Sequence, residues 1–245
     1  MTTLISPTYT PLDLLASDLR TQGYAVLSPV DVLTFAQCRP DELEALRAGW
    51  DDLPPDNFLR DGGRYRRRRH SSFVVEEAAL QQVPHRAHYQ PVEYNALHGG
   101  MHRMFEPVKA EDVQRPVWSR LLLAIGGVCS QVKGAQPWFV EAHQFRIDTT
   151  GGIGRPTPEG AHRDGVDFVA ILLVARDDIK GGESRIFEFE GPNGKRFTLA
   201  EPWTLLILDD QRVIHETTPI QPAAPGGHRD TLVLTYRAGG FLEKA

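Results

Sequence analysis

The chain beyond Trp138 is broken into short apolar or alternating runs, and this pattern constrains the fold more than any other feature. The runs recur roughly every 8 to 12 residues, between clusters rich in glycine, proline, asparagine and aspartate. They cover residues 139–147, 167–175, 184–189, 196–199, 203–208, 213–219 and 231–236. Many short strands at this spacing are typical of a β-sandwich or β-barrel. We therefore predict a mainly β protein.

The first 135 residues combine helical and strand signals. Apolar residues at helical spacing predict three helices, and short apolar runs elsewhere predict three strands. We expect a single domain over residues 1–245. Residues 1–135 form a mainly helical or mixed part that packs on the core, and residues 136–245 hold most of the core and the candidate site. The expected helices are 10–22, 41–48 and 117–133, and the expected strands are 24–27, 64–75 and 92–97, the last as a partner of the second.

Composition excludes several classes of function. The 245 residues carry a formal net charge of −5 and a pI of about 6.0, which argues against a nucleic-acid binder with a broad basic surface. Two cysteines exclude a disulfide framework and a cysteine-rich zinc module. The longest apolar runs fall short of the roughly 18 to 20 residues that span a bilayer. Residues 1–11 show no secretory signal pattern, so we expect a cytoplasmic protein that binds neither nucleic acid nor a membrane.

His162-Arg163-Asp164 is the first group of residues that indicates chemistry. In an extended segment His162 and Asp164 point to the same side, so both can bind one metal ion. His215 follows another apolar run and is the candidate third ligand. Two histidines and one carboxylate on one face of an octahedron are typical of non-haem Fe(II) oxygenases. We therefore predict that these three residues are the metal ligands and the catalytic centre.

A second triplet of the same form, His228-Arg229-Asp230, is not followed by a histidine that could complete the set. The first triplet follows a loop rich in glycine and proline and precedes a predicted strand, which favours it as the metal site. The alternative is that His162 and His215 are ordinary surface or core histidines.

Arg229 and Thr231 form a candidate anion site at the start of the last predicted strand. They face the same side of that strand. A guanidinium can bind a carboxylate through two hydrogen bonds, and a hydroxyl can add one more. Arg237 shares that side at the far end of the strand and is the rival candidate. The alternative for Arg229 is a surface charge at the strand end.

These motifs resemble those of the bacterial 2-oxoglutarate/Fe(II) dioxygenase family that includes the free L-isoleucine 4-hydroxylases and the BsmA-like proteins. The resemblance covers most of the chain beyond about residue 55 and is strongest from Ala142 to Tyr236. It rests on Pro158-Glu159-Gly160-Ala161-His162-Arg163-Asp164-Gly165-Val166-Asp167-Phe168-Val169, Gly181-Gly182-Glu183-Ser184, Asp209-Asp210 and His215-Glu216-Thr217-Thr218-Pro219-Ile220, with His143-Gln144-Phe145-Arg146 and Arg64 to Arg69 upstream.

The resemblance implies a double-stranded β-helix (jelly-roll, cupin-like) core with flanking α-helices. It implies Fe(II) on His162, Asp164 and His215, 2-oxoglutarate on Arg229, and O2 as a further co-substrate. The implied activity is hydroxylation of a small molecule, with a free L-amino acid as the substrate class. Two other functions stay open: a cupin-like metal hydrolase or isomerase, which has no need of the Arg229 clamp, and a non-catalytic 2-oxoglutarate-sensing stress or biofilm protein.

An amino-acid substrate needs a fixed cation for its carboxylate, because an unpaired buried charge is costly. Gln144 and Arg146 share one face of the first long strand, and we predict that this face is the barrel interior. Arg66 and Arg68 share one face of the basic run and can reach the same ligand. We predict all four as substrate-binding residues. The alternatives are a structural ion pair for Arg146 and a solvated strand face for the basic run.

Overall fold

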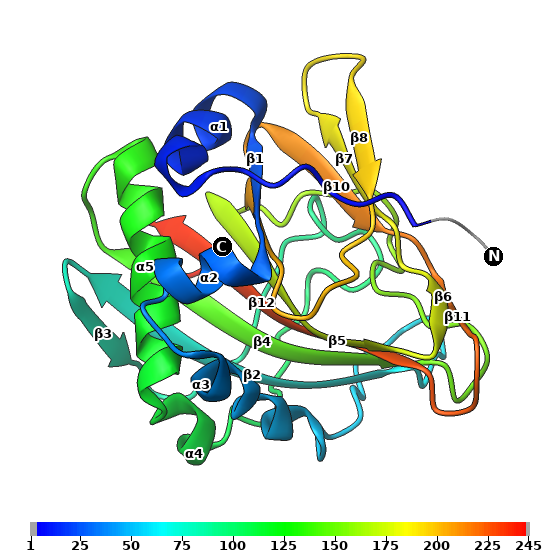
Figure 1. The fold of residues 1–245 in the computed structure, drawn as a ribbon. Helices are drawn as coiled ribbons and strands as arrows, with labels where there is room; N and C mark the ends of the chain where they lie inside the picture. The colour runs from blue at the N-terminus through cyan, green and yellow to red at the C-terminus, as the bar shows by residue number, and fades with distance from the viewer. Residues whose placement is uncertain (1–3, 244–245) are drawn as a thin grey trace.

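Seven antiparallel strands form the largest sheet of the computed structural model, which describes residues 4–243. Their order across the sheet is β1-β9-β5-β12-β4-β2-β3. Strand β12 therefore runs between β4 and β5 at the centre of the sheet (Figure 1). The bounds are β1 Tyr24–Leu27, β2 Arg66–Glu76, β3 Ala79–Gln82, β4 Trp138–Asp148, β5 Phe168–Asp177, β9 Leu205–Asp209 and β12 His228–Ala238.

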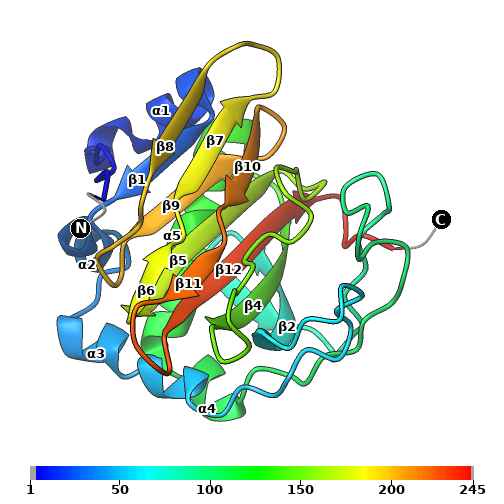
Figure 2. The ribbon, with the colours of Figure 1, turned by 90° about the vertical axis from the view of Figure 1, so that its right-hand side faces the viewer.

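A second layer of shorter strands faces the inner side of this sheet, as expected for a jelly-roll (Figure 2). Apolar residues of both layers, including Ile171 of the large sheet and Ile186 of the short one, form the core between them. Alternate residues of β5 serve two cores, so its sequence is almost continuously apolar. The second layer contains β10 Val213–Thr217, β7 Ser184–Glu188 and β8 Gly194–Phe197 in one sheet, and β11 Ile220–Pro222 with β6 Ile179–Gly181 in another.

Helices cover the outer face of the large sheet (Figure 1). The longest, α5, begins at Pro116, where the missing N–H costs nothing. Its apolar face packs on the sheet, and Gly126 permits the close approach, because a Cβ there would lie 2.7 Å from Val75. The helical segments are η1 Leu12–Leu14, α1 Leu15–Gln22, α2 Pro29–Phe35, α3 Pro40–Glu44, η2 Arg47–Trp50, α4 Ala110–Val113 and α5 Pro116–Lys133.

The structure confirms the mainly β architecture, the strand at 24–27 and the long helix that begins near residue 117. One pairing is wrong: residues 92–97 form turns, and β2 instead pairs with β3 and β4. The helix expected over 41–48 ends earlier, at Glu44, before the short η2. The first 135 residues also contribute three strands to the large sheet, in addition to the helices that cover it.

Residues 1–3 and 244–245 lie outside the residues that the structure describes. The prediction of no secretory signal includes residues 1–3, and the prediction of a single domain includes both of these ends. Within residues 4–243, no helix is both long and apolar enough to cross a membrane.

Candidate metal centre and ligand cavity

His162 and His215 lie directly opposite each other in an isolated antiparallel bridge. The backbone N–H of each donates to the carbonyl of the other, at N–O distances of 3.0 and 2.9 Å. Residues paired in this way project their side chains to the same face, and the two ring centroids are 4.6 Å apart. The bridge joins β10 to the loop before β5, so the local backbone itself brings the two imidazoles together.

Asp164 is aimed at these imidazoles by a backbone turn that Asp210 holds. The Asp210 carboxylate accepts hydrogen bonds from the backbone N–H of Asp164, Gly165 and Val166, at 2.9, 2.8 and 3.1 Å. Gly165 has a φ of +79°, a conformation that disfavours other residues. Gln90 donates to Asp164 Oδ1 at 3.1 Å. The hydrogen bonds that Asp210 accepts from the backbone and the one that Gln90 donates to the side chain therefore both fix the position of the Asp164 carboxylate.

The donor atoms of His162, Asp164 and His215 fit one metal ion. The Asp164 oxygens lie 3.7 Å from His162 Nε2 and 3.6 Å from His215 Nε2, close to the separation of about 3 to 3.5 Å between ligands of one ion. His162 Nδ1 donates to the carbonyl of Gly160 at 3.0 Å, which leaves Nε2 free to coordinate. The structure thus confirms that the three predicted ligands form one cluster.

The electrostatics of the cluster also suit a cation. Burial alone would lower the pKa of His162, but the hydrogen bond and charge of Asp164 raise it to about 10. Burial alone would raise the pKa of Asp164, but the two histidines hold it well below its usual range. Burial and the neighbouring His162 lower the pKa of His215 to about 4. A metal ion would replace the proton that His162 holds beside the carboxylate.

Arg229 and Thr231 line the same cavity as the metal cluster. The Arg229 side chain is buried, and its Nε and Nη2 atoms make no hydrogen bond with residues 4–243. Burial, followed by the charge of Arg176, lowers the pKa of Arg229 to about 10, so the side chain stays cationic at neutral pH. A buried cation without an acceptor is costly, and a carboxylate entering the cavity would supply one. Arg237 of the same strand is absent from the cavity wall.

A second group of buried arginines lines another part of the same cavity. Arg66 and Arg68 project from β2 and share Asp56, with N–O distances of 2.7 and 3.8 Å. Arg103, in the loop before α4, joins them. The predicted placement of Arg66 and Arg68 on one face is confirmed, whereas their role in substrate binding stays a prediction.

The predicted placement of Gln144 and Arg146 is wrong. Both lie on the outer face of β4 and are absent from the cavity wall. Arg146 forms a two-bond ion pair with Asp230, directly opposite on β12, at 2.8 and 2.6 Å. Gln144 donates a hydrogen bond to Asp112 of α4. The inner face of β4 carries the odd-numbered residues Glu141, His143, Phe145 and Ile147.

Several residues of the cavity wall were not predicted from the sequence. The Glu159 carboxylate lies 3.4 Å from His162 Nε2, and its position three residues before His162 was the only sequence feature that pointed to it. Arg103, His88 and Gln90 come from a segment without a recognisable motif. The His-Gln-Phe-Arg motif does contain His143 of the inner face, but two-residue alternation alone does not say which face is inside.

A jelly-roll with two histidines, one carboxylate and a buried arginine in one cavity is the arrangement of a non-haem iron oxygenase that uses an anionic co-substrate. A family model for 2OG-Fe dioxygenases matches residues 47–235, and the chain belongs to this family. The family uses Fe(II), 2-oxoglutarate and O2.

Solved structures show the same fold. A bsmA homologue from Methylobium petroleophilum is 48% identical over 100% of both chains, with a TM-score of 0.93. IDO from Bacillus thuringiensis is 17% identical over 94% of this chain and 100% of its own, with a TM-score of 0.77. The Fe(II)/α-ketoglutarate-dependent dioxygenase TqaL is 19% identical over 91% of this chain and 86% of its own, with a TM-score of 0.72. A search of the curated proteins found no match.

Replacing Asp210 by alanine is expected to weaken metal binding, because Asp164 then loses the backbone turn that aims its carboxylate. Outer partners of metal ligands typically contribute about 10- to 100-fold to affinity, and calorimetric titration with Ni(II) measures the loss. The control is Asp209→Ala, because Asp209 contacts Lys133 and makes no bond to the 164–166 backbone. Equal affinities of Asp210→Ala and the wild type would contradict the role given to Asp210.

Proposed function

We propose that the protein hydroxylates a free L-amino acid, with Fe(II) on His162, Asp164 and His215 and 2-oxoglutarate on Arg229. Membership of the dioxygenase family supports the reaction type. The resemblance of the sequence to the isoleucine 4-hydroxylases supports the substrate class. The cytoplasmic location stays a prediction from the sequence.

The observation that carries the proposal is the presence of two separate arginine groups in one cavity. Across the sheet, Arg229 of β12 is in register with Ile147 of β4, which is in register with Arg66 of β2. Two strand spacings therefore separate the arginines by about 10 Å. The apolar Ile147 and Phe145 lie between the two groups on the cavity wall. Such a cavity suits two anionic small molecules, a co-substrate on one side and a substrate on the other.

In this proposal the protein residues bind the co-substrate and the substrate, orient them and exclude water. Arg229 and Thr231 hold the distal carboxylate of 2-oxoglutarate, and the apolar Val166, Ile171 and Val233 exclude water around it. Iron and 2-oxoglutarate, when bound, supply the oxidising chemistry. The second arginine group fixes the substrate so that one carbon faces the metal, and this placement determines which carbon is oxidised.

The proposal is tested by incubating the protein with Fe(II), ascorbate, 2-oxoglutarate and each proteinogenic L-amino acid in turn. We expect one or a few of them to stimulate succinate formation well above the slow rate without substrate, and to gain one oxygen atom by mass. The control reaction omits 2-oxoglutarate. Tight 2-oxoglutarate binding with no stimulation by any amino acid would contradict the proposal and favour the sensor function.

A further inference from the structure

His88 and Arg103 face each other across a second isolated antiparallel bridge. The two residues exchange backbone hydrogen bonds at 3.0 and 2.9 Å. Their Cα atoms in such a pair are about 5.5 Å apart and their side chains project to the same face. Both side chains line the cavity. The bridge therefore presents an imidazole and a guanidinium side by side to whatever enters.

Arg103 is a buried cation that forms no ion pair with any residue from 4 to 243. Its side chain is 2% exposed, and its Nε and Nη2 atoms have no hydrogen-bond partner in the described part of the chain. The nearby Asp56 is occupied by Arg66 and Arg68. Burying such a cation costs free energy unless an anion pairs with it. A planar carboxylate matches the two parallel N–H groups of a guanidinium.

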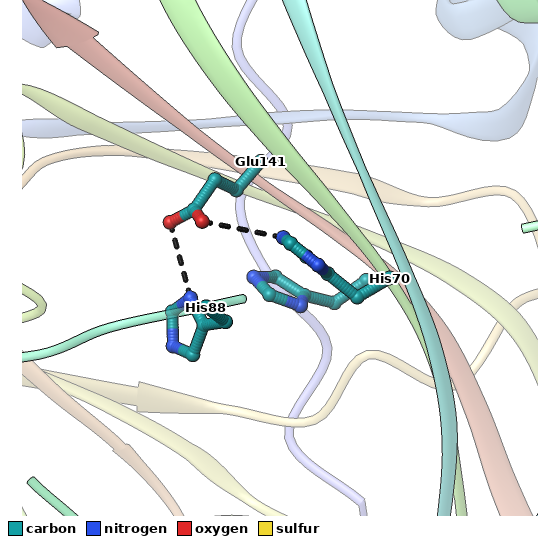
Figure 3. Close-up of side chains that lie close together, drawn as sticks. His70, His88 and Glu141 are labelled. Atoms are coloured by element: carbon teal, nitrogen blue, oxygen red, sulfur yellow. Dashed lines mark hydrogen bonds and ion pairs between the residues drawn. The ribbon is translucent and has the colours of Figure 1, made fainter. Parts of the chain in front are cut away.

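His88 presents a hydrogen-bond acceptor beside this cation. Glu141 accepts hydrogen bonds from His88 Nδ1 at 3.1 Å and from His70 Nε2 at 3.2 Å (Figure 3). Arg86 also contacts the same carboxylate, at 3.3 Å. Because His88 Nδ1 carries the ring proton and donates a hydrogen bond to Glu141, Nε2 of the neutral ring is an acceptor. Glu141 therefore positions His88 to receive a proton-donating group.

A second cluster of donor atoms, all within 4.8 Å of one another, is close enough to hold a metal ion. It consists of His70, His88, Glu141 and His143. The surrounding charges oppose a metal ion at this cluster. Arg68 Nη2 lies 2.7 Å from His143 Nδ1, and Arg86 contacts Glu141. A dication among these donors would stand against two guanidinium groups at short range. A hydrogen-bonded network around an ionised carboxylate accounts for the same distances without that repulsion.

We propose that Arg103 and His88 form the recognition site for an α-amino acid: Arg103 binds the substrate carboxylate, and His88 Nε2 accepts a hydrogen bond from the α-ammonium group. The carboxylate and the ammonium group are attached to one carbon of the ligand. This arrangement matches the Arg103 and His88 side chains, which project side by side from the bridge. Arg68, fixed between the rings of Phe105 and Phe145, adds positive charge on the carboxylate side. This inference rests on the proposed function and names the residues that select its substrate.

The test uses the full-length protein with Ni(II) and 2-oxoglutarate, so that binding is measured without turnover. The probes are the amino acid that most stimulates the wild type, its primary amide, and the corresponding acid without the amino group. Calorimetry should show Arg103→Gln binding the amino acid about 10- to 150-fold more weakly, with the already weak binding of the amide unchanged. Arg103→Lys should recover part of the loss. His88→Phe should weaken binding of the amino acid and leave that of the deaminated acid unchanged.

Arg67→Gln is the matched control, because Arg67 lies on the same basic strand but on its outer face and should leave all three affinities unchanged. Wild-type affinity of Arg103→Gln for the amino acid would overturn the inference while leaving the proposed function intact. If no amino acid binds the wild type but deaminated acids bind through Arg103, the proposed function and the role of His88 are overturned, and only the carboxylate site at Arg103 stands. If neither class binds, both fail. Two Ni(II) ions per wild-type chain, reduced to one in Glu141→Gln, would show a second metal site and overturn the inference.

Discussion

Replacing His215 by alanine is expected to abolish stoichiometric metal binding while the fold is retained. His215 supplies one of three donors, and its bridge to His162 is made by backbone atoms that alanine preserves. Loss of an outer partner typically weakens metal binding by about 10- to 100-fold, and loss of a ligand itself should exceed that range. Anaerobic titration with Fe(II), or titration with Ni(II), measures the affinity, and circular dichroism verifies the fold.

His228→Ala is the matched control for this experiment. His228 belongs to the second His-x-Asp triplet, but its imidazole lies near Asp177 and Asp230, at 3.5 and 3.6 Å, and is absent from the cavity wall. It should bind metal as the wild type does. Undiminished binding by His215→Ala would remove His215 from the site. The metal that a recombinant sample carries is a separate matter, because ligand affinity alone does not favour iron over nickel or zinc.

The His162 and Asp164 part of the metal centre was predictable from the sequence because it depends on short-range geometry. His162 and Asp164 are two residues apart in an extended segment, so their common direction follows from strand geometry alone. His215 follows a run of apolar residues that becomes β9, which is buried throughout. Likewise, the apolar run at residues 167–175 predicted the strand that becomes β5. Local pattern and burial were sufficient in these cases.

The substrate side of the cavity was not predictable in the same way. Strand β4 carries polar residues on both faces, because Glu141 and His143 face the cavity while Gln144 and Arg146 pair outside it. Alternation reveals the two sets but not which one is inside. Arg103 and His88 lie in a segment without regular strands, and only the isolated bridge between them, which no sequence pattern indicates, gives them a common direction.

The environment of Arg229 explains why its loss should affect the co-substrate and not the metal. Arg229 lies near the start of β12, on the same face as Thr231, and both side chains line the cavity. The neighbouring Asp230 is occupied by Arg146 on the outer face of the sheet. The Arg229 side chain is therefore held in the cavity with its charge available to a ligand.

Arg229→Ala should leave metal affinity nearly unchanged and weaken 2-oxoglutarate binding by about 10- to 150-fold, since a lost charged hydrogen bond is worth roughly 1.5 to 3 kcal/mol. Calorimetric titration of the Ni(II)-loaded protein with 2-oxoglutarate measures the change. Arg237→Ala is the control, because Arg237 lies at the far end of β12 and bonds the carbonyl of Gly240. It should bind 2-oxoglutarate as the wild type does. A large loss in Arg237→Ala with none in Arg229→Ala would place the co-substrate at the other end of the strand and contradict the cavity assignment.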